Sequence, residues 1–138
     1  MRRLALLLSV TFVMGIAVGW FAVKRVSGYS EPVKRTVLLK TDLAGTEGRE
    51  GVLWLIEISP GAATGKHYHP GHEFVYVLEG AGRTSVEGKP EATVRAGEVV
   101  YLPPGQVHNT TNASTAAPAK ALVVYIGEKD QLLVVPVQ

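Results

Sequence analysis

Cysteine is absent from the 138-residue chain, which excludes a disulfide framework, a thiolate metal site and a cysteine nucleophile. Apolar residues at helical spacing are also lacking after position 35, where short β-branched and aromatic runs occur instead. Glycine (15 residues) and proline (8 residues) separate these runs, as turn residues do. The composition therefore predicts one all-β domain, because a chain of this length provides a single core of ordinary size.

Acidic residues are missing from the first 30 positions. Four of the 14 lysines and arginines lie there, so the rest of the chain carries ten basic and 12 acidic residues, a net charge of −2. The ten basic residues are scattered and lack the aromatic interleaving that single-stranded nucleic acid requires. We therefore expect no nucleic-acid partner.

One long apolar run occurs near the N-terminus. Residues 4–23 contain no charge and are flanked by two basic residues on each side. As a helix they would span about 30 Å, the thickness of a bilayer core. Residues 1–28 are predicted to be a signal peptide or a transmembrane anchor, since small-x-small cleavage patterns end at Gly19 and Gly28. Residues 29–34 would then be a polar tether.

This N-terminal arrangement also predicts a location. A short basic segment followed directly by an apolar run is typical of secreted and signal-anchored proteins. We expect the globular domain to be extracytoplasmic, periplasmic or secreted, with membrane contact through the N-terminal segment if that segment is uncleaved. The basic residues on both sides of the run leave the membrane orientation open.

The remaining chain divides into short segments of strand character. Strands are predicted at residues 35–40, 52–58, 74–79, 83–87, 92–95, 98–102, 107–111, 121–126 and 132–137, with a further short strand at 67–69. Their number and their Gly or Pro turns are typical of a sandwich or barrel. Several of them are apolar on both faces, so we expect an outer sheet face to be covered in a homodimer.

Three of the four histidines lie within twenty residues. His67 and His69 are two positions apart, and in an extended strand both side chains point to one side. Pro70 and Gly71 follow as a turn dipeptide, in which glycine supplies a conformation that other residues resist. A hairpin at this turn would bring the carboxylate of Glu73 towards the two imidazoles.

Two longer patterns resemble the two signatures of the cupin family. The first, Gly, five residues, His-x-His, three or four residues, Glu, six residues, Gly, is matched by Gly61, His67, His69, Glu73 and Gly80. The second, Gly, five residues, Pro-x-Gly, two residues, His, three residues, Asn, is matched by Gly97, Pro103, Gly105, His108 and Asn112. The resemblance covers about residues 35–137. It implies a small single-domain (type-2) cupin, whose fold is a double-stranded β-helix or jelly-roll barrel, here preceded by the N-terminal helix.

The same resemblance implies a metal site formed by His67, His69, Glu73 and His108. Three imidazole nitrogens and one carboxylate oxygen suit a divalent transition metal, one of Fe, Mn, Ni, Cu, Co or Zn, whereas calcium and magnesium prefer oxygen ligands. In an octahedral centre, these four ligands would leave two positions for water, substrate or dioxygen. The alternative is that the fold is present and the site holds no metal.

Function stays open between two classes at this point, because the family includes dioxygenases, isomerases, decarboxylases, sugar-binding proteins and seed storage proteins. One hypothesis is a metal-dependent oxidoreductase, dioxygenase-like, acting on a small organic substrate; no catalytic residue beyond the ligands is identified. The alternative is a non-catalytic module that binds or senses a sugar or carboxylate and contains a structural metal.

Five other residues near the signatures carry separate expectations. His72 adjoins Glu73 and should therefore face the opposite side of the strand. Asn112 is expected to be structural, because Asn side chains satisfy backbone groups in turns. Tyr76, Tyr101 and Gln106 either contribute polar groups to a bound ligand or pack as ordinary strand and loop residues.

Overall fold

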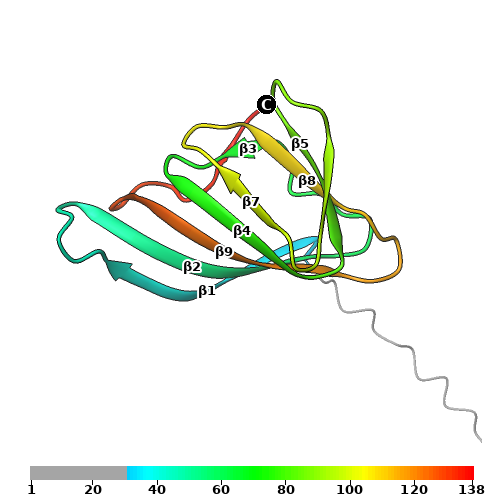
Figure 1. The fold of residues 1–138 in the computed structure, drawn as a ribbon, viewed down its shortest axis with the longest axis horizontal. Coiled ribbons are helices and arrows are strands. Elements are labelled where there is room, and N and C mark those ends of the chain that lie inside the picture. The colour runs from blue at the N-terminus through cyan, green and yellow to red at the C-terminus, as the bar shows by residue number, and fades with distance from the viewer. Residues whose placement is uncertain (1–30) are drawn as a thin grey trace, which may run out of the picture.

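The computed structural model describes residues 31–138, which form two five-stranded antiparallel sheets packed face to face (Figure 1). The strands are β1 Val33–Asp42, β2 Arg49–Ile58, β3 His67–Tyr68, β4 His72–Glu79, β5 Ala81–Val86, β6 Ala92–Arg95, β7 Val99–Leu102, β8 His108–Asn112, β9 Ala119–Glu128 and β10 Val135–Pro136. The first sheet has the order β1-β2-β9-β4-β7 and the second β10-β3-β8-β5-β6. This arrangement confirms the all-β prediction and is consistent with a jelly roll.

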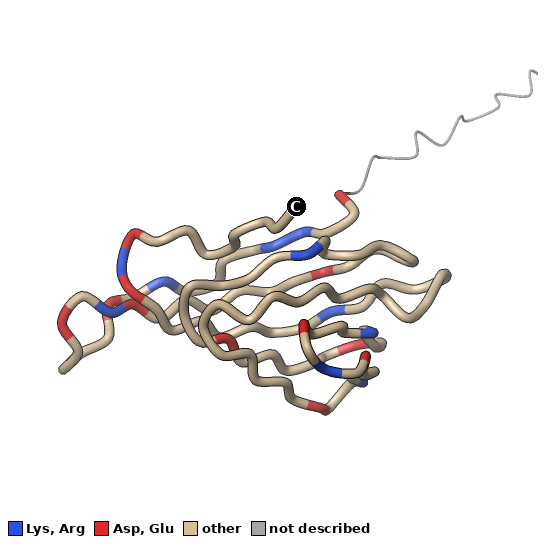
Figure 2. Tube along the Cα trace, turned by 90° about the horizontal axis from the view of Figure 1, so that it is seen from above, with Lys and Arg blue, Asp and Glu red and all other residues tan. Residues whose placement is uncertain are grey.

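The predicted N-terminal helix lies outside the described residues. Within residues 31–138 no helix has the length and apolarity needed to cross a bilayer. Strand β1 begins at Val33, so the last two residues of the predicted tether belong to the barrel. Lysines and arginines are interspersed with acidic residues in this part of the chain (Figure 2).

The core lies between the two sheets and is centred on β2 and β9. These strands pair over their full lengths, with Val52 opposite Tyr125 and Trp54 opposite Val123. Those four side chains are almost fully buried and form one hydrophobic cluster. Because side chains alternate along a strand, the intervening residues of β2 and β9 point to the outer face of the first sheet.

The turn between β3 and β4 crosses from one sheet to the other, so the predicted hairpin at Pro70-Gly71 is wrong. Strand β3 pairs with β8 and β10, whereas β4 pairs with β7 and β9. Gly71 does not have a positive φ. A Cβ at this position would instead lie 2.7 Å from the Cα of Gly127 and 2.7 Å from the ring of Tyr125. Glycine is therefore required by close packing against β9.

The last predicted strand is also shorter than expected. Only Val135–Pro136 of residues 132–137 pairs in a sheet, where it is antiparallel to β3. Leu133, two positions before this strand, packs against the core cluster instead. A side chain that packs into the core in this way interrupts regular pairing, and the apolar sequence pattern does not distinguish the two outcomes.

Asn112 ties the end of β8 to two neighbouring loops, which confirms its structural role. Its side-chain NH₂ group donates to the carbonyls of Ile58, Ser59 and Ala117 at 3.0, 3.2 and 2.9 Å, and its side-chain oxygen accepts from the Ser114 N–H at 2.9 Å. The residue is only 2% exposed. These bonds replace the water that the buried groups would otherwise need.

We expect Asn112→Ala to lower the free energy of unfolding by about 3 kcal/mol, because several buried backbone groups lose their partner. Urea denaturation of the metal-free protein measures this change. Asn109→Ala is the matched control, since Asn109 accepts one side-chain bond from Thr64 and is only partly buried. Equal effects of the two substitutions would contradict the structural role assigned to Asn112.

Candidate metal centre

Three histidines converge inside the barrel. His67 on β3 lies directly opposite His108 on β8, and their ring centroids are 4.3 Å apart. His69 follows β3 and lies on the same side, as the two-residue spacing predicts. One ring nitrogen of each histidine lies within 4.8 Å of the corresponding nitrogens of the other two, and all three residues are buried. The three side chains are close enough to hold one metal ion.

Backbone carbonyls orient all three imidazole rings. The Nδ1 atom of each ring faces a main-chain carbonyl oxygen. Nδ1 of His67 lies 2.8 Å from the Gly65 oxygen, and Nδ1 of His108 lies 2.9 Å from the Gln106 oxygen. Nδ1 of His69 contacts the Leu133 oxygen. A carbonyl can only accept, so each Nδ1 carries the ring proton and donates it. The Nε2 atoms are left with free lone pairs, which is the state in which histidine binds a metal.

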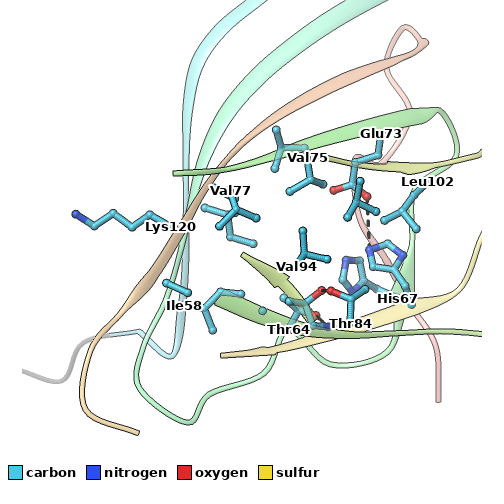
Figure 3. Close-up of a pocket in the computed structure, with 18 residues that line it drawn as sticks. Ile58, Thr64, His67, Glu73, Val75, Val77, Thr84, Val94, Leu102 and Lys120 are labelled. Carbon is cyan, nitrogen blue, oxygen red and sulfur yellow. Dashed lines mark hydrogen bonds and ion pairs between the residues drawn. The ribbon is translucent and has the colours of Figure 1, made fainter. Parts of the chain in front are cut away.

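Glu73 reaches this cluster from the opposite sheet. Its Oε2 atom lies 3.1 Å from Nε2 of His69 and 3.5 Å from Nε2 of His108. Figure 3 shows its carboxylate directed across the cavity towards the histidines. The structure therefore brings together all four residues predicted as ligands.

The contact between His69 and Glu73 is unfavourable without a positive charge. Because the His69 proton is on Nδ1, Nε2 presents a lone pair to a carboxylate oxygen. Both atoms are buried, and neither has a hydrogen-bond partner among the residues that the structure describes. A cation between them would satisfy both atoms, so the donor set fits a metal of the nitrogen- and oxygen-binding type.

His67 and His108 are neutral at physiological pH. Burial lowers the pKa of His67 to about 4; the hydrogen bond to Gly65 opposes this shift, and the neighbouring His108 and His69 add to it. Burial also lowers the pKa of His108, against the opposing effects of Gln106 and Glu73. Neutral imidazole is the form that binds metal, so protons compete weakly near pH 7.

In the metal-free protein, the free energy of unfolding should fall as pH decreases from 6.5 to about 4. The unfolded chain takes up a proton at His67 in this range and the folded protein does not, so protonation favours unfolding. The contribution of His67 is about 3 kcal/mol over the full range.

Denaturation of His67→Gln at several pH values should therefore give a shallower pH dependence than the wild type. His72→Gln is the control, since His72 lies outside the cluster. An unchanged slope in His67→Gln would contradict the assigned protonation state.

A cavity of about 70 Å³ adjoins the cluster and is walled mainly by aliphatic side chains. These include Ile56, Ile58, Val75, Val77, Val94, Val100, Leu102 and Val123. Besides the metal-centre residues, three threonines line it, and the hydroxyls of two of these, Thr84 and Thr110, lie 3.0 Å apart. Lys120 also borders the cavity, but its amine points away (Figure 3) and lies 3.5 Å from Glu79. The space holds a few water molecules or a small organic group.

The other candidate residues lie outside this cavity. His72 faces the outer side of the first sheet, as predicted, where it is hydrogen-bonded to the Tyr101 hydroxyl at 2.9 Å. Tyr76 is on that same outer face and is 44% exposed, so neither tyrosine reaches the cavity. Gln106 contributes through its main-chain carbonyl, which orients His108. Leu133 has the same role for His69, and no sequence pattern predicts a partner 64 residues away.

Two facing antiparallel sheets with a histidine cluster between them define a jelly-roll protein with a candidate metal centre. A family model described as "Cupin domain" matches residues 54–125, just over half of the chain. The chain therefore belongs to the cupin family, as the two signatures predict. No curated protein matches the sequence.

Several solved structures have a similar fold. The DMSP lyase DddQ from Ruegeria pomeroyi is 21% identical, with a TM-score of 0.64 over 80% of this chain and 54% of its own. The polyketide cyclase RemF from Streptomyces resistomycificus is 26% identical, with a TM-score of 0.60 over 78% of this chain and 72% of its own. An oxalate oxidase is 23% identical, with a TM-score of 0.61 over 77% and 55%. The chain thus spans about half the length of the first of these proteins.

Proposed function

We propose that this protein is a metal-dependent enzyme that acts on a small organic molecule, with one divalent transition metal held by His67, His69, His108 and Glu73. The observation that carries the proposal is the 3.1 Å contact between two buried lone pairs, Nε2 of His69 and Oε2 of Glu73. The contact adjoins a cavity of about 70 Å³, and a purely structural metal has no need of such a space.

The bound metal would supply Lewis-acid chemistry or a site for dioxygen. The protein's own contribution is orientation and exclusion of water. Carbonyls of three separate segments hold the imidazole rings, so the Nε2 positions are set before a metal arrives. The aliphatic wall lowers the local dielectric constant, which strengthens any electrostatic contact between metal and substrate.

The similar solved structures differ in reaction type, since they include a lyase, a cyclase and an oxidase. Their similarity supports chemistry on a small molecule in general and does not select a reaction. Among the possible reactions, a dioxygenase-like oxidation is the one to test first, because four protein ligands would leave room at a six-coordinate metal for substrate and dioxygen.

The test begins with elemental analysis of protein purified without an affinity tag, because the metal identity narrows the reaction class. Protein reloaded with Fe, Mn, Ni or Cu is then assayed for oxygen consumption and product with phenols, diketones, flavonols and thiols. Metal-dependent turnover is the expected result. Saturable binding of a ligand without product would instead support a non-catalytic sugar- or carboxylate-binding module with a structural metal.

We also infer a homodimer formed through the outer face of the first sheet. Large apolar side chains are exposed there: Phe74, Tyr76, Leu78, Val99, Tyr101 and Val124. Strand register places Tyr76 beside Val99, and Phe74 between Tyr101 and Val124, so these residues form continuous rows across three strands. An apolar surface of this extent favours association, and a self-complementary sheet face suits two-fold symmetry.

Light scattering at micromolar concentration should give a dimer for the wild type and a monomer for Tyr76→Lys with Val99→Glu. Leu132→Lys is the control, because Leu132 is 71% exposed on the loop before β10 and not in these rows. A monomeric wild type would contradict the dimer and leave the proposal of the metal enzyme unaffected.

Finally, we propose that the domain acts outside the cytoplasm. The support is the charge-free run at residues 4–23 behind a basic N-terminus. Cell fractionation with N-terminal sequencing of the mature protein distinguishes a cleaved signal from a retained anchor. Recovery of the full-length chain in the cytosol would contradict the proposal.

A further inference from the structure

Arg35 lies on the cavity side of the first sheet, on its edge strand β1. Strand register pairs Arg35 with Ile56 of β2, whose side chain lines the cavity. Paired residues on neighbouring strands share a face, so the guanidinium stands on the side where the metal centre lies. The adjacent Lys34 is directed to the outer face, where its amine lies 3.9 Å from Glu57.

The charge of Arg35 affects the metal centre. The positive guanidinium contributes to lowering the pKa of both His67 and His108, and Glu73 acts on Arg35 in return. Desolvation lowers the pKa of Arg35, against the opposing effect of Glu73, although its side chain is exposed at the surface. An exposed side chain on the inner side of an edge strand lies at the border between the barrel interior and solvent.

Arg35 has no ion-pair or hydrogen-bond partner for its side chain within residues 31–138. Each ion pair in this part of the chain uses a lysine or a histidine, and the lysines involved are Lys34, Lys40, Lys120 and Lys129. The N–H donors of this guanidinium are therefore free to bind an anionic ligand.

We propose that Arg35 is an anion-binding subsite at the mouth of the metal cavity, and that the substrate is a small carboxylate with a short aliphatic body. This inference rests on the proposed function, in which the metal holds another part of the same molecule. A guanidinium matches a carboxylate because two parallel N–H donors meet its two oxygens.

The lining of the cavity supports this substrate class. The mainly aliphatic wall offers too few polar partners for a sugar phosphate or a polyhydroxylated ring. Lys120, the one cationic residue that borders this cavity in the described chain, directs its amine outwards. Arg35 is therefore the group that would select for a negative charge. The paired hydroxyls of Thr84 and Thr110 could form one further hydrogen bond with the ligand.

The test is a ligand-observed NMR titration of Zn²⁺-loaded protein with propionate, and with propionamide as its uncharged counterpart. Wild-type protein should bind propionate at least 10-fold more tightly than propionamide. Arg35→Ala should weaken propionate binding by about 10- to 100-fold, in line with one lost charge-assisted contact, and leave propionamide binding unchanged. Arg35→Lys should retain part of the preference.

Lys34→Ala is the matched control, because it removes the neighbouring positive charge from the opposite face and should change neither affinity. Equal propionate affinity in Arg35→Ala and wild type would overturn the subsite. Loss of zinc from Arg35→Ala would also overturn it, by showing that Arg35 supports the ligands. A wild-type protein that takes up neither zinc nor Fe, Mn, Ni or Cu would refute the proposed metal enzyme, and propionate titration of that metal-free protein would still decide whether Arg35 binds the anion.

Discussion

The double variant His67→Ala with His108→Ala is expected to purify without stoichiometric metal and with unchanged strand content. It removes two of three converging imidazoles and leaves His69 and Glu73, a pair too small to retain a divalent ion against buffer. Elemental analysis measures the metal, and far-ultraviolet circular dichroism measures the strand content. The fold should persist because its core is formed by β2 and β9, away from these substitutions.

His72→Ala provides the control for this experiment. It removes the one histidine of the four that lies outside the cluster, on the outer face beside Tyr101. The metal content should stay at the wild-type value. Stoichiometric metal in the double variant would mean that the ion binds elsewhere, and the assignment of the site would then be wrong.

A large loss of stability is expected for Gly71→Ala, about 3 kcal/mol or more. The added methyl group would meet the main chain of Ile126 and Gly127 and the ring of Tyr125. Main-chain atoms of a central strand cannot move aside without breaking the pairing of β9 with β4. Because this turn also carries the chain from His69 to Glu73, metal binding should weaken together with stability.

Chemical denaturation of Gly71→Ala beside Gly88→Ala isolates the cause. Gly88 has a φ of +79° and no atom within 4 Å of an added Cβ, so its substitution should cost only the backbone strain of about 1 kcal/mol. If the two variants were equally stable, close packing would not be the reason for glycine at position 71.

The metal ligands could be predicted from the sequence because the two signatures carry them as fixed positions. The spacing of His67 and His69 alone places both on one side of a strand, and the structure confirms this. Glu73 does reach these histidines, as predicted, but the predicted hairpin that would bring it there is wrong. Local spacing does not reveal that β3 and β4 belong to different sheets, since the choice of pairing partner depends on strands far away in the chain.

The sequence by itself determined the all-β class, the cupin family and the identity of the residues that meet at the centre, because alternation, turn residues and signature spacing are local properties. Only the tertiary structure decided which groups surround them. The carbonyl of Leu133 orients His69 from 64 residues away, and Arg35 shares the cavity side through its register with Ile56. The physical reason is that such contacts depend on the closure of two sheets, which brings distant segments together without leaving a periodic pattern in either one.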